Sequence, residues 1–246
     1  MIIDFHSLNK RFKGDFMCKP LEKLCGKSAE YILDNYGEKN VYPIDIVQIV
    51  NNIGGISLGS MDFTNLDRTF CKEKNEKVRI VGAVRVFDNA VQIIYSKNLD
   101  PDKDNEHSDM TENERKEKLK RSQRFTIAHE LAHCCLHINA NERQNYIEFR
   151  SHSSKKGYDK REEVANIFAG ELLMPKYILD EFVRNPEEYD LSNVNGDVSV
   201  EKLADAFWVN NHVMVERLRY LRKTENVYNK ICFDIGKIKG AEDLAI

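Results

Sequence analysis

The stretch RSQRFTIAHELAHCCLH, from Arg121 to His137, decides the fold and the chemistry expected of this chain. It contains the HExxH pentapeptide HELAH at residues 129–133, within a run that is typical of a helix. Residues four apart lie on one face of an α-helix, so His129 and His133 can bind one metal ion through their imidazoles. Glu130 is next to the first histidine, where its carboxylate can reach a water on that metal. The pattern predicts metal-assisted peptide hydrolysis.

The composition is that of an ordinary globular protein. The chain has 246 residues, of which 41% are hydrophobic and 31% charged, so it can form one sizeable domain with its own core. A formal net charge of -3 gives no electrostatic basis for general binding to nucleic acid or to membrane surfaces. No apolar run has the length of a signal-peptide core or of a membrane span. We therefore expect a cytoplasmic protein that binds no membrane.

The cysteines give no sign of a disulfide framework or of a structural zinc site, because none of them forms a CxxC pair. Cys134 and Cys135 follow the second histidine, but on a helix they point roughly 100° and 200° away from it. We expect these two thiols to be reduced and packed in the core. The six cysteines are Cys18, Cys25, Cys71, Cys134, Cys135 and Cys232.

The chain before this stretch predicts two helices and a small sheet. Apolar spacing favours a helix from Ser28 to Gly37, and then a shorter helix that begins with Pro43 and ends at Gly54. The pair Asp88-Asn89 tolerates turn dihedrals, so the strands on either side of it should form an antiparallel hairpin. Strands are predicted at residues 56–63, 69–72, 78–87 and 91–95.

Helices are also expected around and after the HExxH segment. Thr111 and Glu114 form a capping-box pattern, so a charged helix should begin there and run into the HExxH segment. A single helix over residues 112–137 would be long for a globular domain, which predicts a break near Ser122. Residues 138–160 are polar and predict a loop. Further helices are expected at residues 161–175, 176–184, 200–207 and 212–222.

A catalytic zinc usually has three protein ligands and one open position, so a third ligand must be found. The helix at 161–175 offers Glu162 near the edge of its buried face, with Glu163 as the alternative. His137 continues the histidine face by one turn; we expect it beside the site or at the surface, with ligation in place of Glu162 as the alternative. Asn166 lies four residues after Glu162, where its side chain could hydrogen-bond a ligand histidine.

Other metal chemistries need residues that the sequence lacks. A bridged di-iron site requires a second Glu-x-x-His, and residues 130–133 hold the only one. A metzincin requires a glycine and a more distant third histidine, and a zinc deaminase requires a downstream PCxxC. The remaining alternative is a helix whose histidines only pack or cap, since so short a motif can arise by chance.

Two segments resemble the ImmA/IrrE family of metallopeptidases, which includes proteases that cleave helix-turn-helix repressors. The segments are RFTIAHELAH at 124–133 and EEVANIFAGELLMP at 162–175. Weaker similarity before and after them extends the resemblance to about residues 28–224. Ala132 departs from the glycine that family members commonly have before the second histidine, and this departure is conservative.

The resemblance implies a compact zincin-like α+β fold, with a small antiparallel or mixed sheet, an HExxH helix and a helical C-terminal part. The family's ligands correspond to His129, His133 and Glu162, with Glu130 as the catalytic base. Two imidazoles and a carboxylate suit zinc, and manganese is the alternative. The expected substrate is a cytoplasmic helix-turn-helix repressor.

We divide the chain into an N-terminal extension at 1–27, a metallopeptidase core at 28–175, a helical segment at 176–224 packed on the core, and a tail at 225–246. The substrate is expected to lie extended beside the strand at 91–95, where it would add main-chain hydrogen bonds. The reaction also needs an oxyanion donor. The candidates in the intervening loop are Arg150, His152 and Tyr158.

Two alternative functions that do not involve proteolysis are also consistent with the sequence. Residues 203–218 have the apolar spacing of a helix-turn-helix, although the same spacing suits two helices packed on a core. A DNA-binding protein would use the basic residues near the end of that segment, Arg217, Arg219, Arg222 and Lys223. The other reading is a regulator that binds a repressor without cutting it, as in a toxin–antitoxin pair. We expect nucleic-acid binding to be absent.

Overall fold

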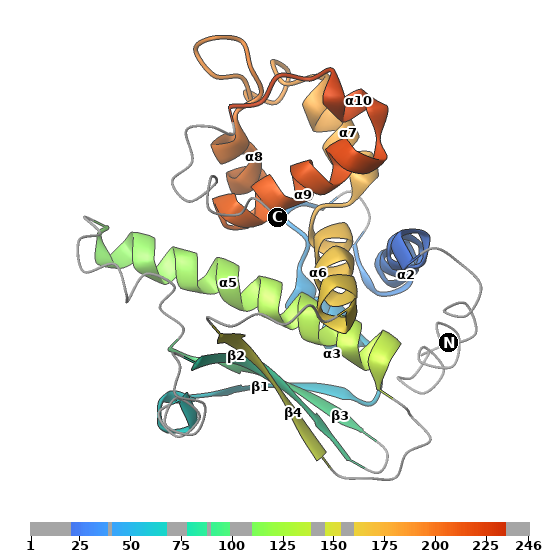
Figure 1. Ribbon diagram of the computed structural model, residues 1–246, viewed down its shortest axis with the longest axis vertical. Coiled ribbons are helices and arrows are strands. Elements are labelled where there is room, and N and C mark those ends of the chain that lie inside the picture. The colour runs from blue at the N-terminus through green and yellow to red at the C-terminus, as the bar shows by residue number, and fades with distance from the viewer. Residues whose placement is uncertain are drawn as a thin grey trace.

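A small sheet lies on one side of a long helix, and further helices lie on the other side (Figure 1). The architecture is α+β, as the sequence predicted. It is seen in a computed structural model, which describes residues 21–38, 41–67, 78–87, 90–98, 110–138, 146–153 and 160–234.

The sheet has four strands in the order β1-β3-β2-β4. β1 runs parallel to β3, whereas β2 is antiparallel to both β3 and β4. The predicted hairpin of β2 and β3 is therefore confirmed. Its turn residues and the strand predicted at 69–72 lie outside the described residues. The strands are β1 (Ile56–Met61), β2 (Val78–Val86), β3 (Val91–Ser96) and β4 (Tyr146–Ser153).

Two predictions about the sheet are wrong. The segment 138–160 is not all loop, because it contains β4. The pattern of β4 is hard to read from sequence, since its apolar Ile147 and Phe149 are exposed while the charged Glu148 and Arg150 are partly buried. In addition, β3 cannot receive a substrate strand, because β1 and β2 already pair with its two sides. The edges of the sheet are β1 and β4.

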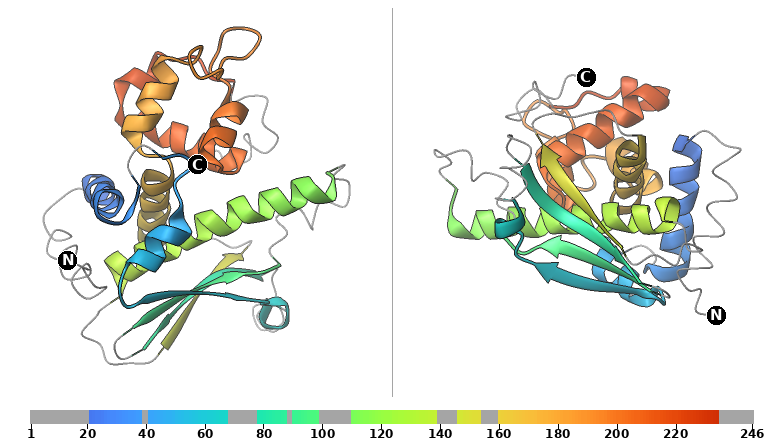
Figure 2. Two further views of the ribbon diagram at one scale, coloured as in Figure 1. Left: turned by 180° about the vertical axis from the view of Figure 1, so that it is seen from behind. Right: turned by 60° about the horizontal axis from the view of Figure 1, so that its bottom comes forward.

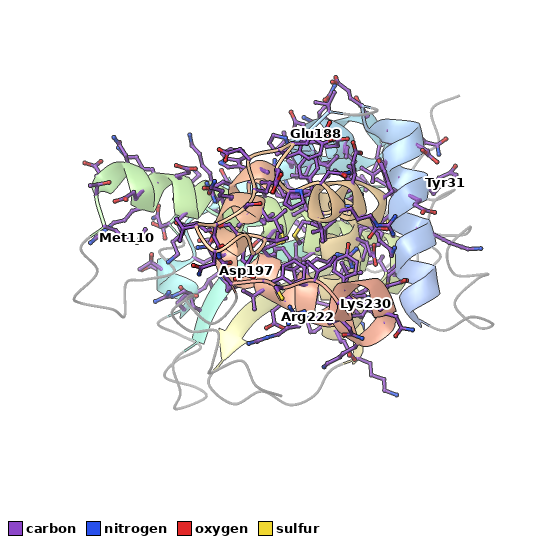
Figure 3. All side chains as sticks on the ribbon, turned by 90° about the horizontal axis from the view of Figure 1, so that it is seen from above. Tyr31, Met110, Glu188, Asp197, Arg222 and Lys230 are labelled. Atoms are coloured by element: carbon purple, nitrogen blue, oxygen red, sulfur yellow. The ribbon has the colours of Figure 1, made fainter. Side chains whose placement is uncertain are left out.

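Helix α5 (Glu112–Ala132) carries the HExxH segment and has no break near Ser122, contrary to the prediction. The capping box predicted at Thr111 closes its N-terminus. The helix begins near Met110, at one end of the molecule (Figure 3), and its first half is exposed. Its second half is buried between the sheet and α6 (Figure 1). Packing of this half stabilises the whole helix, which continues as a π-helical segment, η1 (His133–His137).

Two helices precede the sheet. Helix α2 (Leu21–Tyr36) begins earlier than predicted, because Cys25 continues its buried face by one turn. Helix α3 (Ile46–Asn52) begins after Pro43 rather than with it, since the Asp45 side chain accepts a hydrogen bond from a backbone N–H of the first turn. α2 packs along α6, and α3 packs against α5.

Most of the described chain after β4 is helical, and these helices lie on the opposite side of α5 from the sheet (Figure 2). They share one hydrophobic core with α2, α3 and α5. Cys134 and Cys135 are part of that core, as predicted. The helices expected at 176–184 and 200–207 are confirmed as α7 and α8. No described helix is long and apolar enough to cross a membrane. The helices after β4 are α6 (Lys160–Leu173), α7 (Lys176–Arg184), α8 (Val200–Phe207), α9 (Asn211–Thr224) and α10 (Asn226–Asn229).

Candidate metal centre

Three side chains from two helices converge at the C-terminal end of α5. The Nε2 atoms of His129 and His133 are 2.9 Å apart. They lie 3.2 and 3.1 Å, respectively, from the two carboxylate oxygens of Glu162. These separations are close to the edge of roughly 3.3 Å in a tetrahedron whose central metal forms bonds of ~2.0 Å. Two imidazoles and one carboxylate in this arrangement fit a divalent metal ion.

The packing of α6 on α5 explains why these residues meet. His129 of α5 and His133, the first residue of η1, share one face of the continuous helix because they are four residues apart. Glu162 lies in the first turn of α6, just before the buried residues that hold this helix against its neighbours, Val164, Ala165 and Phe168. Glu163 is exposed and is not part of the group, so the structure places Glu162 rather than the alternative glutamate beside the imidazoles.

The protonation of these groups suits metal binding. Burial, followed by the positive charge of Arg150, lowers the pKa of His129 well below its ordinary value. His129 is therefore neutral at pH 7, as a metal ligand must be. Partial burial raises the pKa of Glu162, but the close contacts of its carboxylate with the imidazoles of His129 and His133 outweigh this effect and hold that pKa well below its ordinary value. Glu162 therefore supplies a negative charge.

Each histidine of the group is also held at its outer nitrogen. Nδ1 of His129 lies 2.8 Å from Oδ1 of Asn166. An amide oxygen can only accept, so Nδ1 carries the proton and the lone pair on Nε2 faces Glu162. Nδ1 of His133 lies 2.9 Å from Nδ1 of His137, which η1 places beside it. The structure thus brings Asn166 and His137 to the outer sides of the histidines, the positions that second ligand-shell residues occupy in metal sites.

Glu130 lies next to this cluster and is not one of its members. Its side chain is buried, and burial raises the pKa of its carboxyl group to about 7. Among the described residues, its Oε1 atom has no hydrogen-bond partner. A buried carboxylate oxygen without a partner is unfavourable for stability, and it leaves a site at which a proton can be held.

Sequence reasoning missed the residue that makes room for this carboxylate. A Cβ atom at Gly82 of β2 would lie 2.8 Å from Oε1 of Glu130 and 2.6 Å from the methyl group of Thr126. Only glycine allows the sheet and α5 to approach this closely. The sole signal in the sequence is a glycine inside the apolar run RIVGAVRV of β2.

Arg150 is the one proposed oxyanion donor whose side chain the structure describes. It is opposite Gly82 in the pairing of β2 with β4, and paired residues project from the same face of a sheet, so Arg150 faces α5. Its guanidinium carbon is 5.7 Å from the centre of the Phe125 ring. The side chain of His152 and all of Tyr158 lie outside the described residues. The charge of Arg150 acts on three groups of the site: His129, Glu130 and Glu162.

The family model of the IrrE N-terminal-like domain, Peptidase_M78, matches residues 93–219. The chain belongs to this family. The matched segment contains α5, β4 and α6, and hence every residue of the cluster. The ImmA/IrrE resemblance of segments 124–133 and 162–175 is confirmed, and the chain is a metallopeptidase of this type. Comparison with curated proteins gave no match.

In this IrrE-like domain, most of the basic side chains suggested for DNA binding make contacts within the chain. Arg217 is buried and binds both carboxylate oxygens of Glu171, at 2.8 and 2.6 Å. Arg222 lies over the ring of Phe233, and Arg219 pairs with a neighbour on its own helix. Helices α8 and α9 bury their apolar faces in the common core. This packing favours the interpretation that both helices are part of the core of the peptidase domain.

Proposed function

We propose that this metallopeptidase is a zinc-dependent endopeptidase that cleaves a cytoplasmic helix-turn-helix repressor. One observation carries the proposal: the imidazoles of His129 and His133 and the carboxylate of Glu162 converge beside the buried, unpartnered Oε1 atom of Glu130. Other buried atoms without a partner occur among the described residues, and this one is distinguished by belonging to a carboxylate next to the three candidate ligands. The choice of a repressor as substrate rests on the family resemblance, and manganese is the alternative metal.

The roles of the residues follow from this geometry. His129, His133 and Glu162 would hold the metal, which when bound polarises the scissile carbonyl and acidifies a water molecule. Glu130 takes a proton from the attacking water and passes it to the nitrogen of the leaving amine. Asn166 and His137 fix the orientation of the two imidazoles through their outer nitrogens.

The substrate would bind along β4, and not along β3 as the sequence predicted. Among the described residues, β4 pairs with β2 alone, so the backbone groups along its other side can pair with an extended peptide. Arg150 on β4 faces the centre of the site, so a peptide at this edge lies close to Glu130. The scissile bond would therefore be presented by main-chain hydrogen bonds.

The test is incubation of the purified, zinc-loaded protein with the repressor encoded next to it, followed by mass mapping of fragments. We expect cleavage at a defined bond by the wild type and by Glu201→Gln, an exposed control on α8. Glu130→Gln should bind the same amount of zinc and cleave nothing. Undiminished cleavage by Glu130→Gln would contradict the proposed mechanism. A stable complex without fragments would favour the regulator that binds without cutting.

A further inference from the structure

Arg150 brings a positive charge into the site that no carboxylate neutralises at close range. In the described parts of the chain, its guanidinium forms no salt bridge within 4.0 Å. Glu148, which precedes it on the same face of β4, is instead paired with Arg161 at 3.2 Å. A charged group in a mostly buried position normally has such a partner. The carboxylates of Glu130 and Glu162 act on its charge only from further away, so its hydrogen-bond donors are available to a group of the substrate.

The position of Arg150 indicates which group of a bound peptide its side chain can reach. Its strand is the open edge along which an extended peptide would bind, and its side chain faces α5 across Gly82. A Cβ atom at Gly82 would lie 2.8 Å from Oε1 of Glu130 and 2.6 Å from the Thr126 methyl group, so the carboxylate of Glu130 lies against the strand that pairs with Arg150. Arg150 and the general base thus lie at the same contact between the sheet and α5, which the scissile group of a peptide paired with β4 would reach. Within that group, negative charge develops on the carbonyl oxygen.

We propose that Arg150 is a further catalytic residue, which donates hydrogen bonds to the oxyanion formed from the scissile carbonyl. The inference rests on the proposed function of the site. The water oxygen bonds to the carbonyl carbon, the C=O π pair moves onto oxygen, and the water proton goes to Glu130. The oxygen pair then re-forms C=O, the C–N bond breaks, and the proton on Glu130 passes to nitrogen. Arg150 stays protonated throughout and stabilises the oxygen only while it is charged.

The kinetic arm of the test compares Arg150→Gln and Arg150→Lys with Arg85→Gln, an exposed arginine on the same sheet. Loss of one oxyanion donor lowers kcat by about 100-fold or more. We expect that loss for Arg150→Gln with KM little changed, a partial loss for Arg150→Lys, and none for Arg85→Gln. Full recovery of Arg150→Gln at higher pH would overturn the proposal, because it would mean that Arg150 acts only on the ionisation of Glu130.

A binding arm needs no proteolysis and separates this inference from the proposed function. Benzylphosphonate, a tetrahedral anion, is titrated calorimetrically into each zinc-loaded protein, with planar phenylacetate as the comparison. Arg150→Gln should weaken phosphonate binding about tenfold or more, the scale of a charge-assisted hydrogen bond, at unchanged zinc content. Equal phosphonate affinity in wild type and Arg150→Gln would overturn the role of Arg150. Failure of the wild type to cut any repressor would instead remove the proposed function, and the phosphonate result would still decide the inference.

Discussion

Two glutamates at opposite ends of α6 have different surroundings. Glu171 binds Arg217 through both of its carboxylate oxygens, and this pair fastens α6 to α9. Glu162 contacts the imidazoles of His129 and His133, of which burial keeps His129 neutral, and its side chain is 42% exposed. At Glu171 the charges of the carboxylate and the guanidinium cancel, whereas Glu162 contacts two imidazoles and, among the described residues, no lysine or arginine within 4.0 Å.

The different surroundings of Glu171 and Glu162 distinguish an ion pair that holds two helices together from a site that can bind a metal ion. A buried pair with matched charges leaves nothing to bind, although removal of one partner is costly. The cluster at Glu162 is instead surrounded by groups that lack close partners among the described residues, namely Oε1 of Glu130 and the guanidinium of Arg150. Such groups are expected where a metal and a substrate complete the structure.

Arg217→Met should produce the largest change in stability. It leaves Glu171 largely buried without its partner, which destabilises proteins by about 3 kcal/mol or more. The free energy of unfolding from urea titration measures this, and zinc affinity should stay unchanged. Lys116→Met, which breaks an exposed pair on α5, should cost less than about 1 kcal/mol. Equal losses for the two variants would remove the distinction between the ends of α6.

Glu130→Gln should stabilise the metal-free protein, whereas Arg217→Met destabilises it. Burial raises the pKa of Glu130 to about 7 from an ordinary value of 4.5. The wild type therefore has its full stability below pH 4.5 and loses it as the pH rises through 7. The glutamine variant does not titrate, so its advantage should grow over this range to roughly 3 kcal/mol. Urea titrations at pH 4.5 and 8 measure it, and a constant difference would contradict the burial argument.

Asn166→Ala should lower the affinity for the metal and leave the free energy of unfolding of the metal-free protein nearly unchanged. The variant loses the hydrogen bond to Nδ1 of His129, and loss of such a contact lowers metal affinity by about 10- to 100-fold. Competition with a zinc chelator measures the change. Asn185→Ala, on an exposed surface of the helical part, is the control and should bind zinc like the wild type. Unchanged affinity in Asn166→Ala would show that His129 is oriented by packing alone.

Local patterns predicted the parts of the fold that depend on local physics. The capping box at Thr111, the face shared by His129 and His133, and the helices α7 and α8 follow from spacing within a few residues. The predicted break near Ser122 is absent because tertiary burial of the second half of α5 stabilises a length that propensity alone would not.

The rest required contacts between distant segments. β4 was not predicted because Glu148 and Arg150 face the site while its apolar residues face outwards, which reverses the usual alternation. The order of the strands, which leaves β4 and not β3 at an edge of the sheet, cannot be read from any one strand. Gly82 matters only because α5 passes over it. Glu162 could be proposed from the helical pattern of α6, and only the packing of α6 on α5 distinguishes it from Glu163.

The most direct test compares zinc affinity in Glu162→Gln and Glu171→Gln, the same substitution at the two ends of α6. Competitive titration with a chelating dye gives both dissociation constants, and circular dichroism verifies that each variant is folded. Loss of a ligand should weaken binding by at least about 100-fold, beyond the effect of an outer contact. We predict this loss for Glu162→Gln, and wild-type zinc affinity with lower stability for Glu171→Gln. Wild-type zinc affinity in Glu162→Gln would contradict the assignment of the metal centre.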